Sequence, residues 1–156
     1  FSLASYTKTK TTYNKKNAIQ DNASVQMADI SAVELTKDML TGWNLGNTLD
    51  ANATKGLSSE TSWGMIRTTK EMFEGLAKSG IKTVRIPVSW ANHFIDDKYT
   101  IDPKWMSRVK QIVDWALESD LYVILNTHQL IQVTDIIQTK IILKNLETFL
   151  QMFGAK

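Results

Sequence analysis

Polar and aromatic side chains gather in three short segments, each at or near the end of a run of apolar residues. The segments contain Trp43, Asn44 and Asn47; Arg85, Trp90, Asn92 and His93; and Asn126 and His128. Amides and imidazoles form hydrogen bonds with hydroxyl groups, and tryptophan rings offer flat apolar faces. This combination suits a ligand that has both hydroxyls and apolar ring faces, and it predicts a binding site where the three segments meet.

Arg85 lies inside an otherwise apolar run that extends from Val84 to Val88. A buried guanidinium without a partner is costly, so this side chain must face either a carboxylate in the core or a binding site. The position of Arg85 close to the carboxyl end of the run favours the binding site.

His128 ends a second apolar run, where it could be a binding-site residue or a hydrogen-bonded core histidine, and spacing does not decide between them. The chain has two histidines and no cysteine, and the other histidine is His93. Because no HExxH-type spacing occurs, we predict no metal site. No glycine-rich phosphate loop follows a predicted strand, so we predict no nucleotide cofactor either.

Three tryptophans, Trp43, Trp63 and Trp90, lie outside the predicted helices. Each of them could pack within a loop or stack against a sugar ring. Taken together, they favour a carbohydrate-binding cleft. Trp105 and Trp115 instead recur at helical spacing with apolar neighbours, which predicts that they belong to the core.

The hydrophobic pattern predicts alternating helices and strands that would position these residues. The expected elements are a short helix capped by Ser31 and Glu34 and ended by Gly42, a helix over 68–79 stopped by Gly80, a strand over 81–90, a helix opened by Asp102 and Pro103, and a buried strand over 121–125. Such alternation forms βαβ units in a parallel sheet, which is either open and doubly wound or closed as a (β/α)8 barrel. The absence of a phosphate loop favours the barrel, whose active sites lie at the carboxyl ends of the strands.

Composition excludes several classes of protein. The chain of 156 residues has 43% hydrophobic and 22% charged residues, as globular proteins do. No apolar run reaches the roughly 18 residues that a membrane span needs, so we predict no membrane partner. The net charge is +2, but residues 1–20 hold four lysines and no acidic residue, which leaves −2 for the remainder. Because nucleic-acid binders concentrate positive charge on their folded part, we predict no nucleic-acid partner.

Four segments, spread over about 90 residues, resemble motifs of endoglucanases from glycoside hydrolase family 5 in their order along the chain. They are Gly42–Ala51, Glu60–Gly64, Thr83–Trp90 and Tyr122–His128. The resemblance implies a (β/α)8 barrel, of which this chain holds the opening β/α units. It also implies a secreted enzyme that hydrolyses β-1,4 links with retention in plant β-glucans such as cellulose, lichenan or xyloglucan.

The same resemblance implies roles for individual residues. The arginine that matches Arg85 supports the catalytic nucleophile in this family, and the histidine that matches His128 lines the subsite next to the cleaved bond. The predicted substrate-binding residues are Asn47, Trp63, Trp90, His93 and Asn126.

Retaining hydrolysis requires two carboxyl groups about 5 to 5.5 Å apart. The resemblance implies that both come from later strands, and the family's Asn-Glu-Pro motif for the acid/base has no match here. The carboxylates near the expected site, at Asp50, Glu60, Asp96 and Asp97, are interpreted as loop charges. We therefore expect this chain to lack catalytic carboxylates and to be inactive alone. The alternatives are a non-catalytic carbohydrate-binding fragment and, less favoured, a nucleotide-dependent enzyme on an open sheet.

The pattern divides the chain into a polar lead-in or linker over 1–27, the N-terminal part of the barrel over 28–128, and a divergent tail over 129–156. The resemblance stops at His128, which indicates either a divergent loop or a shifted reading frame. Read two bases later, a back-translation of residues 151–156 can encode Asn-Val-Trp-Ser-Lys. This string resembles the helix that follows the third strand in the family and favours the frameshift.

Overall fold

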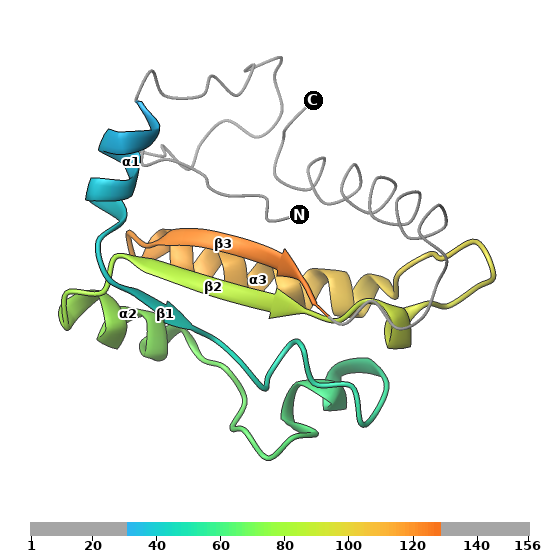
Figure 1. Cartoon of the computed structure of the whole chain (residues 1–156). Coiled ribbons are helices and arrows are strands. Elements are labelled where there is room, and N and C mark those ends of the chain that lie inside the picture. The colour runs from blue at the N-terminus through green and yellow to red at the C-terminus, as the bar shows by residue number, and fades with distance from the viewer. Residues whose placement is uncertain (1–30, 129–156) are drawn as a thin grey trace, which may run out of the picture.

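The computed structural model describes residues 31–128, which contain three parallel strands in one sheet with the order β1-β2-β3. The strands are β1 (Gly42–Asn44), β2 (Thr83–Val88) and β3 (Tyr122–Thr127). Helix α2 (Lys70–Lys78) connects β1 to β2, and helix α3 (Pro103–Glu118) connects β2 to β3 (Figure 1). The predicted alternation of strands and helices in a parallel sheet is confirmed.

Helix α1 (Ala32–Met39) lies at the amino ends of the strands (Figure 1). Its capping box is formed as predicted, because the Glu34 backbone N–H donates to Ser31 Oγ at 3.3 Å and the Ser31 backbone N–H donates to Glu34 Oε2 at 3.1 Å. The helix ends at Met39, whereas the sequence predicted an end at Gly42, which instead begins β1. The Tyr122 hydroxyl donates to Asp38, and this bond raises the pKa of Tyr122 to about 12.

Strand β2 is central, and its side chains alternate between two environments. Val84, Ile86 and Val88 are fully buried in one hydrophobic cluster with residues of α3. Successive side chains of a strand point to opposite faces of the sheet. Arg85 therefore points to the face opposite the one on which α3 packs.

Pro87 is the penultimate residue of β2, and it follows the last residue of β2 that pairs with β1 by two positions. Its missing N–H therefore interrupts no hydrogen bond between these two strands. The pairing of β1 with β2 ends at Asn44 and Arg85, before Pro87 is reached. Beyond this point the backbone N–H of Ser89 donates to the carbonyl of Leu49 at 3.0 Å. A proline near the end of the run is thus tolerated, as the sequence predicted.

Helix α3 contributes more residues to the described hydrophobic core than any other element. Pro103 occupies its first turn, and Asp102 caps it by accepting from the Lys104 backbone N–H at 2.8 Å. Trp105 is fully buried, as predicted. Trp115 is half-buried, and the guanidinium carbon of Arg108 lies 5.1 Å from the centroid of its ring.

Two further differences from the sequence-based expectations concern α2 and β3. Helix α2 buries Phe73 and stops before Gly80, whose φ of 89° favours glycine, as predicted. Strand β3 was predicted to be buried on both faces, but only Tyr122 and Val123 are buried, and the remaining residues are half-buried. Within residues 31–128, β3 pairs with β2 alone, so no neighbouring strand covers its other edge.

The lead-in over 1–27 and the tail over 129–156 lie outside the described residues, so the predictions made for them stay predictions. Between residues 31 and 128, no helix is long and apolar enough to span a membrane.

We expect Asp102→Ala to lower the free energy of unfolding by about 1 kcal/mol, because the first turn of α3 loses a side-chain acceptor for a backbone N–H. Urea denaturation followed by circular dichroism measures this change. The control is Asp97→Ala, which removes an exposed carboxylate from the preceding loop. Equal effects of the two substitutions would show that the cap contributes nothing specific.

Candidate functional site

The guanidinium of Arg85 links all three strands at the carboxyl end of the sheet. Its Nη1 donates to Asn44 Oδ1 at 2.6 Å, and its Nη2 donates to Asn126 Oδ1 at 2.5 Å. Asn44 lies directly opposite Arg85 on β1, whereas Asn126 pairs with Pro87, two residues further along β2. Arg85 and Asn126, both named from the sequence as site residues, are therefore brought into contact.

Within the described residues, the side-chain partners of Arg85 are both neutral amides. Within residues 31–128, no carboxylate forms an ion pair with Arg85, so the alternative of a structural arginine with a core carboxylate finds no support there. A guanidinium has five N–H donors, and these two hydrogen bonds leave others for a further acceptor. Among the residues that the structure describes, the positive charge of Arg85 is thus held in place by neutral groups.

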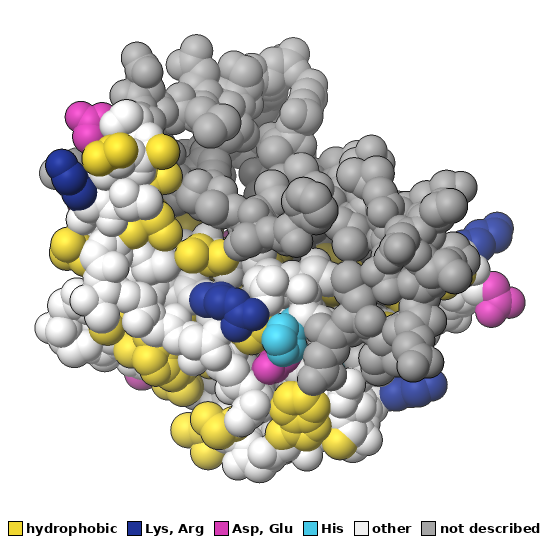
Figure 2. All heavy atoms as spheres, in the orientation of Figure 1, with side chains coloured by type: hydrophobic (Ala, Val, Ile, Leu, Met, Phe, Trp, Pro, Cys, Tyr) yellow, Lys and Arg dark blue, Asp and Glu magenta, His cyan; other side chains and the backbone are white. Residues whose placement is uncertain are grey.

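His128 continues the line of β3 beside this arginine. Its backbone N–H donates to the carbonyl of Val88 at 2.8 Å, which extends the pairing of β2 with β3 beyond Thr127. Residues two apart on a strand share a face, so His128 and Asn126 project to the same side. Figure 2 shows a histidine and a basic side chain close together on the face that it presents.

The second cluster is more deeply packed than the sequence suggested. Trp90 is half-buried and packs against the hydrophobic core. His93 is only 3% exposed, and its ring stacks on Trp105 with 3.6 Å between centroids and 7° between planes. Within the part of the chain that the structure describes, neither ring nitrogen of His93 has a hydrogen-bond partner. Burial lowers the pKa of His93 to about 4, with a partly opposing effect of Asp102. Contact between His93 and a substrate stays a prediction.

The remaining candidates lie on the loop that joins β1 to α2. Asn47 is exposed and has a φ of 61°, a left-handed conformation that asparagine tolerates better than most residues. Trp63 is 37% exposed and follows the short 3₁₀ helix η1 (Gly56–Thr61). Asn92, from the 3₁₀ helix η2 (Ala91–His93), ties this loop down, because its Nδ2 donates to the Thr54 carbonyl at 2.9 Å.

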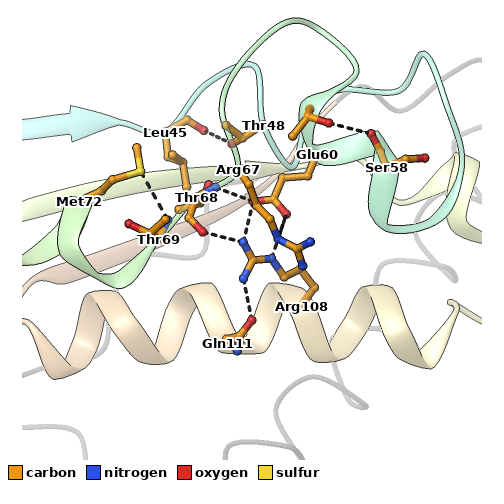
Figure 3. Close-up of polar contacts among 11 residues, drawn as sticks. Leu45, Thr48, Ser58, Glu60, Arg67, Thr68, Thr69, Met72, Arg108 and Gln111 are labelled. Carbon is orange, nitrogen blue, oxygen red and sulfur yellow. Dashed lines mark hydrogen bonds and ion pairs between the residues drawn. The ribbon is translucent and has the colours of Figure 1, made fainter.

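Glu60 is not the loop charge that the sequence suggested, because its side chain is fully buried against α3. It accepts from Arg108 Nε at 2.9 Å and from Arg108 Nη2 at 2.8 Å, a bidentate pair that Figure 3 shows. The same carboxylate accepts from the Thr68 backbone N–H at 2.8 Å. Burial acts to raise the pKa of Glu60, but the hydrogen bonds from Arg108 and Thr68 outweigh it and hold the pKa below its usual value.

Asp50 also differs from its interpretation as a loop charge. It is 5% exposed, and its Oδ1 accepts from the Thr48 backbone N–H at 2.9 Å. Asp96 and Asp97 are exposed in the loop before α3, as a loop charge would be.

One sequence signal could have identified the role of Glu60. Arg108 lies on the apolar face of its helix, next to Val109, and a buried arginine at such a position requires an acidic partner.

Comparison with known proteins identifies the family to which this parallel sheet and its connecting helices belong. The family described as Cellulase (glycosyl hydrolase family 5) matches residues 46–152, which is more than half of the chain. The chain belongs to glycosyl hydrolase family 5. The resemblance drawn from the four motifs is thereby confirmed, and the three described strands are the opening units of its (β/α)8 barrel. The match continues past His128, and the domain boundary placed there stays a prediction.

Individual relatives are similar to about 70% of this chain. Endoglucanase 1 of Ruminococcus albus is 51% identical over 111 residues, which are 70% of this chain and 27% of that protein. A family 5 enzyme from Prevotella bryantii B14 is 40% identical, with a TM-score of 0.62 over 68% of this chain and 31% of the other. A family 5 lichenase variant from Caldicellulosiruptor sp. F32, solved with cellotetraose, is 41% identical, with a TM-score of 0.62 over 74% of this chain and 32% of the other. This chain thus spans about a quarter to a third of the length of these relatives.

Active sites of (β/α)8 barrels lie at the carboxyl ends of the strands, and Arg85 and His128 lie at this edge of the sheet. Hydroxyl groups of a ligand could be bound there by amides, an imidazole and a guanidinium. Within residues 31–128, no group of three or more His, Cys, Asp or Glu residues is arranged to hold a metal ion.

The buried His93 generates a prediction about pH. Its pKa is about 4 in the folded chain, against an ordinary value of 6.5. Between these values the unfolded chain binds a proton that the folded chain does not bind. The free energy of unfolding should therefore fall by up to about 3 kcal/mol as the pH is lowered from 6.5 to 4.

His93→Phe keeps a stacked ring against Trp105 and removes the titrating group, so it should abolish most of this dependence. Urea unfolding at pH 7 and pH 5 measures it, and His128→Phe serves as the control that should retain it. A His93→Phe chain with the original pH dependence would assign the effect to another group.

Proposed function

We propose that this chain comes from an endo-β-1,4-glucanase that hydrolyses plant β-glucans with retention of configuration. The observation that carries the proposal is the guanidinium of Arg85, which the neutral amides of Asn44 and Asn126 hold at the carboxyl edge of a family 5 sheet. A fixed positive charge at this edge favours the ionised form of a neighbouring carboxylate, and a glycosidase nucleophile must be ionised. Arg85 is thus proposed to support the nucleophile.

The other residues at this edge are proposed to bind the sugar chain. His128 shares a face with Asn126, and together they offer hydrogen-bonding groups to the glucosyl unit beside the cleaved bond. Trp63 and Trp90 offer apolar ring faces, and Asn47 offers an exposed amide. His93 is proposed to contact substrate only if its stack with Trp105 opens, because the ring is buried.

Catalysis needs two carboxyl groups about 5 to 5.5 Å apart at this edge. Between residues 31 and 128, the two strongest candidates are already engaged, because Glu60 is paired with Arg108 and Asp50 is bonded to a backbone N–H. We therefore propose that the 156-residue chain by itself does not hydrolyse glucan. Binding without cleavage is the second candidate function, and the exposure of Trp63 favours it.

The proposed substrate is a β-1,4-linked glucan such as cellulose, lichenan or xyloglucan. Support comes from relatives, which include the lichenase solved with cellotetraose and a xyloglucan-specific endo-β-1,4-glucanase solved with cellotriose. We further propose an extracellular location, because polymeric plant glucans occur outside the cells that degrade them.

We expect the purified chain to release no reducing ends from carboxymethylcellulose above background. General acid catalysis alone commonly contributes about 10²- to 10⁴-fold, and the chain offers no free carboxylate pair for it at the described edge. Glu60→Gln and Asp50→Asn variants are assayed alongside. Turnover that survives purification and disappears in one of these variants would mean that the catalytic carboxylates have been misplaced.

The same chain should be retarded in gels that contain soluble β-glucan, and Trp63→Ala and Arg85→Met should reduce the retardation. Ile95→Ala is a matched control, because Ile95 is an exposed apolar residue of a different loop. Migration unaffected by β-glucan would contradict both candidate functions.

A further inference from the structure

The loop over residues 61–67 combines a charged pair beneath it with apolar side chains on its surface. Trp63, Met65 and Ile66 are 37%, 38% and 70% exposed, while Glu60 and Arg108 at its base are 0% and 5% exposed. This distribution is the reverse of the usual one, in which charges are exposed and large apolar groups are buried. Both the burial of the charged pair and the exposure of the apolar side chains therefore need a physical explanation.

The base of the loop is closed by a small network that includes both of its ends. Glu60 precedes the loop and accepts from the Thr68 backbone N–H at 2.8 Å, while Arg108 Nη2 donates to the Thr68 carbonyl at 2.7 Å. Arg108 also donates twice to Glu60, so the two ends of the loop are joined through one guanidinium (Figure 3). Gln111 accepts from Arg108 Nη1 at 2.6 Å, which fixes the guanidinium on α3.

This fixed base is connected to Trp63 by a short, hydrogen-bonded stretch of backbone. The Ser62 N–H donates to the Ser59 carbonyl at 3.0 Å, and the Gly64 N–H donates to the Thr61 carbonyl at 3.1 Å. Gly64 has a φ of 84°, which a residue with a side chain would adopt only under strain. The backbone on both sides of Trp63 is therefore held by turns whose acceptors, Ser59 and Thr61, flank Glu60 in the sequence.

We propose that Glu60 and Arg108 are positioning residues that hold the 61–67 loop so that Trp63 presents its ring to a β-glucan chain. The inference rests on the proposed function and adds to it a pair of residues that do not touch the sugar. A ring that is already oriented loses less conformational entropy on binding, so the pair acts through affinity. The bidentate geometry matters, because one flexible contact would fix the distance between loop and helix without fixing the angle.

The test is a double-mutant cycle on the full chain, with cellotetraose binding measured by isothermal titration calorimetry. We expect Trp63→Ala to weaken binding about tenfold, as loss of one aromatic contact does. Glu60→Gln should weaken it to a similar extent, and the Glu60→Gln/Trp63→Ala chain should bind no worse than Trp63→Ala alone. If Glu60 acted independently of Trp63, the two losses of affinity would multiply, and the Glu60→Gln/Trp63→Ala chain would bind about a hundredfold more weakly than the unmodified chain.

Asp114→Asn is the matched control, because it changes a carboxylate to an amide on α3 in the partly exposed ion pair with Lys110. It should bind like the unmodified chain. If Glu60→Gln does not fold, as judged by circular dichroism, Arg108→Lys replaces it in the cycle, since lysine keeps the charge but not the fork. Unfolding of both variants would contradict the proposal, because the pair would then support the whole sheet rather than this loop.

The two proposals fail in different ways. An unmodified chain that does not bind cellotetraose overturns the proposed function, and the positioning role with it. An unmodified chain that binds, together with a folded Glu60→Gln chain of equal affinity, overturns the positioning role alone.

Discussion

The parallel pairing of β2 with both of its neighbours is the constraint on which the candidate site depends. It places Asn44 opposite Arg85 and puts Asn126 two residues further along, so one guanidinium reaches both amides. A shift of one residue in β2 would exchange its two faces, turning Arg85 toward α3 and Val84 and Ile86 toward the site. Burial of those apolar side chains in the core therefore also fixes the orientation of the arginine.

Two arginines show how the same side chain takes different roles in this fold. Arg108 meets a carboxylate, a carbonyl and an amide, so its charge is paired and it joins the β1–α2 loop to α3. Removing one partner of such a buried pair commonly costs about 3–5 kcal/mol, because the other charge stays buried. Arg85 meets two neutral amides, which orient it without pairing its charge. The first arrangement joins a loop to a helix, and the second holds a positive charge among neutral groups of the described strands.

Sequence reasoning predicted what local patterns determine and missed what depends on distant contacts. The caps at Ser31 and Asp102 and the stop at Gly80 were predicted because each depends on residues within one turn. The burial of Glu60 was missed because its partner lies 48 residues away on α3. The stacking of His93 on Trp105 likewise depends on how η2 meets α3, which no spacing reveals. Arg85 was predicted to face a site or a carboxylate, and only the structure shows that amides from two other strands hold it.

The central claim is that the carboxyl edge of this sheet binds a β-1,4-glucan chain. A titration of the isotope-labelled chain with cellotetraose, followed by amide chemical shifts, tests it most directly. The account predicts saturable shifts that are largest around Arg85, Trp90 and Asn126, with little change on the outer face of α3 around Lys110. Shifts confined to α3, or no saturable shifts in a folded chain, would contradict it.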